Sequence, residues 1–122
     1  METFATMQNA AILLGLAALG GLTMAVMRFR GTPRPPDWMP IGHGLAAATG
    51  VVLLAYAAFT VGVPKMAQIA LGLFVLAAIG GLTINLQFHR KQLPLPIHFV
   101  VGHAAAAVTG YALLLLAIFG GS

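Results

Sequence analysis

The sequence predicts an all-α integral membrane protein: a four-helix bundle built from two tandem two-helix units in the same orientation. Three observations predict it. Apolar residues make up 60% of the 122 positions and charged residues only 7%, whereas charged residues are about a quarter of a soluble domain. Four apolar stretches are each near or above the roughly 20 residues needed to cross a bilayer. The second half of the chain also repeats the first.

The four apolar stretches run over residues 8–27, 37–60, 64–88 and 96–119. They are continuously apolar rather than alternating, which favours helices over barrel strands. Pro36 and Pro96 stand at the starts of the second and fourth stretches, where a missing N–H costs little. Asp37 is placed to cap the second helix. We therefore expect a single transmembrane domain over residues 1–122.

The internal repeat consists of identical residues at a constant offset of 60 positions. It pairs Gly20-Gly21-Leu22-Thr23 with Gly80-Gly81-Leu82-Thr83, Gly42-His43 with Gly102-His103, and Thr49-Gly50 with Thr109-Gly110. About 22 of some 52 aligned positions are identical, too many for a shared apolar bias alone. The copies cover about residues 4–62 and 64–122. Each holds two helices, an even number, so we expect a pseudo-two-fold axis along the membrane normal.

Basic residues gather in the first and third connections between the predicted helices. The first connection holds Arg28, Arg30 and Arg34, and the third holds Arg90 and Lys91. Because basic loops stay in the cytoplasm, we expect these two loops inside and both termini outside, in a prokaryotic inner membrane. The formal net charge of +4 is explained by this topology signal, so no nucleic-acid partner is inferred.

Several classes of chemistry lack the side chains they need. The sequence contains no cysteine, which excludes disulfides, iron–sulfur clusters and thiolate metal sites. Its two carboxylates are Glu2 and Asp37, too few for a calcium cage or a pair of catalytic acids. The candidates that remain are binding and carrier functions rather than a stand-alone enzyme.

The strongest candidate site is a pair of histidines, His43 and His103. Each lies six or seven residues inside its predicted helix, roughly 10 Å below the cytoplasmic end, and an ionisable residue at that depth is a functional candidate. The repeat places them at equal depth on opposite sides of the axis. Two opposed imidazoles can supply both axial ligands of one haem iron. We therefore predict one haem b, with His43 and His103 as its metal ligands.

Small and basic residues surround this pair. The predicted cofactor-binding residues, besides the two histidines, are Gly20, Gly21, Gly80, Gly81, Ala47, Gly50, Ala107, Gly110, Arg28, Arg30 and Arg90. The glycines and alanines would leave a layer for a flat macrocycle, since positions i+3, i+4 and i+7 share the histidine face. The arginines would meet the haem propionates. Thr23 and Thr83 could orient the histidine N–H groups.

Simpler interpretations exist for each feature. Small residues in membrane helices usually allow close helix packing, and basic loops are topology signals first. His89 and His98 have no histidine counterpart in the repeat and are expected at the membrane interface. Three alternative functions follow: a cofactor-free accessory or assembly subunit, a small transporter, or a protein that binds a chlorophyll-type pigment at each histidine.

A small four-helix bundle with histidines on two helices, small residues below them and a basic cytoplasmic end resembles the membrane b-type cytochromes, of which cytochrome b561 is the familiar kind. The resemblance is architectural and covers the bundle. Those proteins commonly hold two haems on four histidines, whereas the present sequence has one buried pair. The resemblance implies electron transfer to or from a quinone or a larger respiratory complex, within membrane lipid, with a homo-oligomer as a further option.

Overall fold

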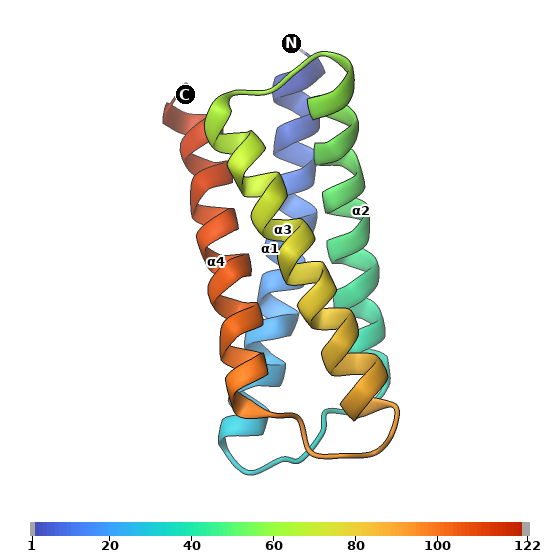
Figure 1. Ribbon diagram of the computed structural model, residues 1–122. Helices are drawn as coiled ribbons and strands as arrows, with labels where there is room; N and C mark the ends of the chain where they lie inside the picture. The colour runs from blue at the N-terminus through green and yellow to red at the C-terminus, as the bar shows by residue number, and fades with distance from the viewer. Residues whose placement is uncertain (1, 121–122) are drawn as a thin grey trace.

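The computed structural model describes residues 2–120 and consists of four long helices (Figure 1). Their bounds are α1 Glu2–Phe29, α2 Trp38–Thr60, α3 Lys65–Ile84, continued by a π-helical turn over Asn85–His89, and α4 Ile97–Gly120. The predicted all-α class is confirmed. All four helices are long and apolar enough to cross a membrane.

The helix ends differ from the prediction in three places. Helix α1 begins at Glu2 rather than at Gln8, and Met7 in this added part packs into the core. The last turn of the third helix is π-helical, with the Arg90 N–H donating to the Asn85 carbonyl at 2.8 Å, a difference that apolar periodicity does not encode. Asp37 occupies the cap position of α2, but its side chain makes no capping hydrogen bond, so that prediction was wrong.

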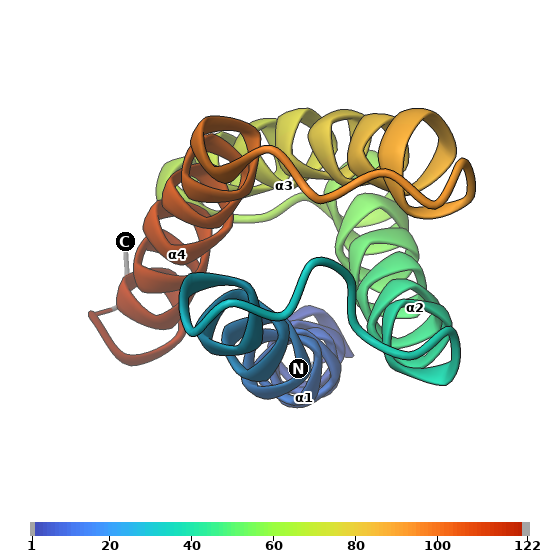
Figure 2. The ribbon, with the colours of Figure 1, turned by 90° about the horizontal axis from the view of Figure 1, so that it is seen from below.

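The helices form a ring in the order α1, α2, α3, α4 (Figure 2). The most extensive contacts join α1 to α2 and α3 to α4, the two helices of each repeat. The loops over residues 30–37 and 90–96 lie at one end, called here the loop end, and the termini and the 61–64 turn lie at the other (Figure 1). Helices α2 and α4, which carry the two candidate histidines, therefore lie diagonally opposite each other in the ring.

Alanines and larger apolar side chains share the core, and further large apolar side chains cover the outside. Leu19, Leu45 and Phe59 are among many large apolar residues that are exposed on the helices, as expected where lipid solvates the surface. The buried cluster comprises Met7, Ala10, Ala11, Leu14, Leu54, Ala67, Ala70, Phe74, Leu114, Ala117 and Ile118. Every member lies between the histidines and the terminal end, so this cluster does not extend into the loop-end half.

The two interfaces between the repeats are not equivalent. Tyr111 of α4 donates a hydrogen bond from its hydroxyl to the Ala11 carbonyl of α1 at 2.9 Å. A Cβ atom on Gly15 would lie 2.7 Å from that hydroxyl oxygen. The counterpart of Tyr111 in the first repeat is Val51, which has no polar group to donate. The pseudo-two-fold axis stays a prediction, and Tyr111 is one departure from it.

Candidate functional site

The two predicted histidines face each other across the ring of four helices. The ring centroids of His43 on α2 and His103 on α4 are 6.0 Å apart, with 77° between the ring planes. Both side chains are half-buried. The fold thus brings together two residues that are 60 positions apart in sequence and places them where one group could contact both.

Each imidazole is held by a carbonyl oxygen of the neighbouring helix. His43 donates from Nδ1 to the Ala17 carbonyl of α1 at 2.7 Å, and His103 donates from Nδ1 to the Ala77 carbonyl of α3 at 2.7 Å. Because a carbonyl oxygen only accepts, Nδ1 must carry the proton. A neutral ring then keeps its lone pair on Nε2, the arrangement usual for a histidine that binds a metal.

Two of the four glycines predicted on the first and third helices make room for these rings. A Cβ atom on Gly21 would lie 2.9 Å from Cε1 of His43, and one on Gly81 would lie 3.0 Å from Cε1 of His103. The neighbouring Gly20 and Gly80 differ, because a Cβ there would meet the nearest histidine atom at 3.9 and 3.8 Å, an ordinary contact. Gly21 and Gly81 are therefore needed for the histidine positions themselves.

The small residues farther along α2 and α4 have a packing role. A Cβ atom on Gly50 would lie 2.7 Å from the side chain of Leu14 on α1, and one on Gly110 would lie 3.3 Å from α3 side chains. These two glycines permit close approach within each helix pair. Ala47 and Ala107 are half-buried, one turn from the histidines, and leave little side-chain volume beside them.

The predicted arginines lie at the loop end rather than beside the imidazoles. Arg28 donates from Nε to the Leu95 carbonyl at 2.8 Å and so joins the end of α1 to the 90–96 loop. Arg30 and Arg90 are exposed. Of these three side chains, only that of Arg28 has a hydrogen-bond partner within residues 2–120.

The groups that orient the histidines were missed by sequence reasoning. Thr23 and Thr83 do not contact them, since their hydroxyls donate to Leu19 and Ile79 carbonyls of their own helices at 2.8 and 2.9 Å. The real acceptors are main-chain carbonyls, which side-chain motifs do not reveal. The only signal was the alanine that stands 26 residues before each histidine in both repeats.

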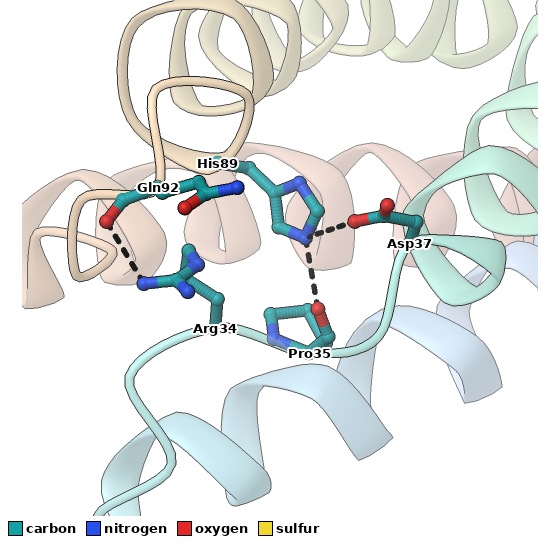
Figure 3. Close-up of polar contacts among 5 residues, drawn as sticks. All are labelled: Arg34, Pro35, Asp37, His89 and Gln92. Atoms are coloured by element: carbon teal, nitrogen blue, oxygen red, sulfur yellow. Dashed lines mark hydrogen bonds and ion pairs between the residues drawn. The ribbon is translucent and has the colours of Figure 1, made fainter.

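A second polar cluster joins the two loops (Figure 3). His89 was expected at the interface, but it is buried, with 7% of its side chain exposed. Its Nε2 donates to the Pro35 carbonyl at 2.8 Å and lies 3.7 Å from a carboxylate oxygen of Asp37. Arg34 donates to the Gln92 carbonyl at 2.9 Å. These contacts tie the 30–37 loop to the end of the third helix.

His89→Ala is expected to lower the stability of the purified protein by about 1–3 kcal/mol, because the Pro35 carbonyl loses its buried donor. The absorption spectrum of any haem bound by the pair on α2 and α4 should stay unchanged. Thermal unfolding in detergent, with His98→Ala as the exposed control, measures the effect. A His89→Ala melting temperature equal to that of His98→Ala would contradict this role.

No protein-family model, curated protein or solved structure matches the chain, so its likeness to the b-type cytochromes stays at the level of four apolar, membrane-length helices.

Proposed function

We propose that this protein binds one haem b between His43 and His103 and passes electrons to or from a partner in the membrane. One observation carries the proposal. The two imidazoles face each other while both Nδ1 atoms donate to main-chain carbonyls at 2.7 Å. This arrangement leaves Nε2 of each ring as the nitrogen available to a metal.

The spacing of the rings suits one metal ion between them. Imidazole nitrogen binds transition metals at about 2 Å, so two such bonds fit within the 6.0 Å that separates the ring centroids. Two separate macrocycles would need a further gap of about 3.5 Å between their faces. The spacing therefore favours one shared group over a chlorophyll-type pigment on each histidine.

The ligand set favours a macrocycle over a bare ion. Among the residues that the structure describes, no group of three or more histidine, cysteine or carboxylate side chains is placed to hold a metal. A protein zinc site usually needs three or four such ligands. A porphyrin brings four nitrogen ligands of its own and needs only the two axial ones that His43 and His103 offer.

The chain's own residues would orient and surround this group. The Ala17 and Ala77 carbonyls fix the ring tautomers, and Gly21 and Gly81 let the rings lie against α1 and α3. Arg28, Arg30 and Arg90 supply cations for the propionates, a role assigned from their place at the loop end. When bound, the haem would supply one-electron transfer, and His43 and His103 would hold its iron.

An absorption spectrum of the purified protein, expressed with ample haem, tests the proposal. We expect a Soret band and an α band that sharpen on reduction with dithionite. A far-red band would indicate a chlorophyll-type pigment. A protein without visible absorbance would be the accessory subunit, and the haem proposal would be withdrawn. A quinone analogue that reoxidises the reduced protein would identify the proposed partner class.

The loop end is proposed to face the cytoplasm, because the last turn of α1 and the two loops there carry the basic residues Arg28, Arg30, Arg34, Arg90 and Lys91. The chain has no cysteine, so single cysteines can report the sidedness. Leu93→Cys at the loop end and Val61→Cys in the opposite turn both replace exposed residues. A membrane-impermeant maleimide added to whole cells should label Val61→Cys only. Labelling of Leu93→Cys instead would reverse the orientation.

Two other positions make poorer reporters, Gly31 in the 30–37 loop and Ser122. Gly31 has a φ angle of +106°, where a cysteine would be strained, and Ser122 lies outside the described residues. The pair Leu93→Cys and Val61→Cys avoids both problems and compares the two ends within folded segments.

A further inference from the structure

A polar cavity of about 530 Å³ opens at the loop end, between the start of α2 and the end of the third helix. It is lined by Arg34, Pro35, Asp37, Pro40, Ile41, Asn85, His89, Arg90 and Gln92. Neither histidine of the facing pair lines it. The cavity is therefore separate from the two histidines proposed to hold haem, and it shares only Arg90 with the residues proposed to bind that group.

The cavity has an excess of positive charge and unused hydrogen-bond donors. Its lining holds two arginines against one carboxylate, Asp37. Arg34 uses one terminal nitrogen for the Gln92 carbonyl and keeps the rest of its guanidinium available. Within the part of the chain that the structure describes, the side chains of Arg90 and Asn85 make no hydrogen bond or ion pair. An anion could therefore bind here without breaking an existing contact.

The walls of the cavity are held in place before any ligand arrives. His89 is buried and fixed to the Pro35 carbonyl, and Arg34 is fixed to the 90–96 loop (Figure 3). The π-helical turn ends at His89, and Gln92 follows with a φ angle of +58°, which turns the chain back toward Arg34. A preorganised site loses less entropy on binding than one that must assemble.

We propose that this cavity binds the phosphate group of an anionic phospholipid. Guanidinium groups bind phosphate oxygens through paired, charge-assisted hydrogen bonds, and basic pockets at the cytoplasmic end of membrane helices are suited to anionic headgroups. The source is lipid because the cavity lies where the apolar helices end. Ile41 in its lining is 60% exposed, and Leu86, which follows the lining residue Asn85 in sequence, is 48% exposed, so acyl chains have apolar surface to contact.

The test measures lipid binding to the purified full-length protein in detergent by native mass spectrometry. Phosphatidylglycerol should form a one-to-one adduct at concentrations where phosphatidylcholine does not. Arg90→Gln should weaken that adduct about tenfold, the effect of losing roughly one charge-assisted hydrogen bond. Arg30→Gln is the matched control, because Arg30 is the exposed repeat counterpart of Arg90 but does not line the cavity. It should bind like the parent.

A charge change of the opposite sign completes the test. Asp37→Asn removes the only carboxylate of the lining and should tighten the phosphatidylglycerol adduct severalfold. Arg90→Gln should melt like the parent, because the Arg90 side chain makes no hydrogen bond or ion pair among the described residues. Asp37→Asn gives up only the 3.7 Å contact with the buried His89, so its melting temperature should fall slightly at most. Equal losses in Arg30→Gln and Arg90→Gln would indicate surface charge only and overturn the site.

Two competitions separate the sources of the anion. Binding of inorganic phosphate without any preference for phosphatidylglycerol would overturn lipid as the ligand. Displacement of phosphatidylglycerol when haem is loaded would assign the cavity to a haem propionate and would also overturn it. Because the adduct is measured on haem-free protein as well, loss of the haem proposal leaves this inference intact. Absence of the phosphatidylglycerol adduct from the parent protein would overturn this inference without bearing on the haem spectrum.

Discussion

Replacing either His43 or His103 by alanine is expected to abolish low-spin bis-histidine haem, and the two losses should be about equal. Both rings have a donor bond of 2.7 Å to a carbonyl and a glycine against Cε1, so neither is the dispensable ligand. Each variant leaves one axial position to water or nothing, which should shift the spectrum toward high spin before haem is lost. Soret absorbance per mole of protein measures both effects.

The equal loss of haem in the two variants is the most specific part of this prediction, because a general role for histidine near the membrane interface implies no such symmetry. His98→Ala is the control, since His98 is exposed and has no histidine counterpart. A normal spectrum in His43→Ala together with haem loss in His98→Ala would keep the haem but overturn the ligand assignment. Unequal losses would indicate that departures from the repeat, such as Tyr111, reach the histidine layer.

The parts of the fold that depend on composition and repetition were predictable from the sequence. Four apolar stretches of bilayer length give four helices, because lipid permits few alternatives for a backbone that must bond to itself. The repeat predicted that His43 and His103 would lie at the same depth, and the structure places their rings opposite each other. Helix positions and matched depth follow from residue spacing alone.

The parts that depend on main-chain atoms and loop geometry were not predictable. The acceptors for the two histidines are carbonyl oxygens of Ala17 and Ala77, and every residue has such an oxygen. His89 has no counterpart in the repeat, yet it is buried by a loop that precedes it by more than fifty residues. Its environment follows from the π-helical turn and the path of the 30–37 loop, neither of which apolar periodicity specifies.

The role of the paired glycines also required the structure. Sequence reasoning assigned Gly21 and Gly81, on the first and third helices, to a layer for a flat macrocycle or to close helix packing. In the ring these two helices are diagonal, and each glycine instead lies against the imidazole of its own repeat. Gly21 and Gly81 are therefore needed to accommodate the imidazoles rather than another helix. Substitutions at these two positions should disturb the histidines directly.

Gly21→Leu and Gly81→Leu are expected to displace the facing imidazoles and to lower haem affinity about 10- to 100-fold, the range found when an outer-sphere support of a metal ligand is removed. Even the first atom of a new side chain, Cβ, would lie only 2.9 or 3.0 Å from Cε1 of the histidine. The ring must move away, and its bond to the Ala17 or Ala77 carbonyl must lengthen. Overpacking should also cost about 1–3 kcal/mol of stability.

The adjacent glycines provide the matched control for this prediction. Gly20→Ala and Gly80→Ala add the same atom one residue earlier, where it meets its nearest histidine atom at 3.9 or 3.8 Å. These variants should bind haem and melt like the parent, whereas Gly21→Ala and Gly81→Ala should already lose affinity. Haem titration and thermal unfolding of the four alanine variants would measure the difference. The prediction would be contradicted by equal haem affinity and melting temperature for Gly20→Ala and Gly21→Ala, and for Gly80→Ala and Gly81→Ala. That result would mean that the imidazoles tolerate a side chain at Gly21 and Gly81, and that the carbonyl bonds do not hold the ligands in place.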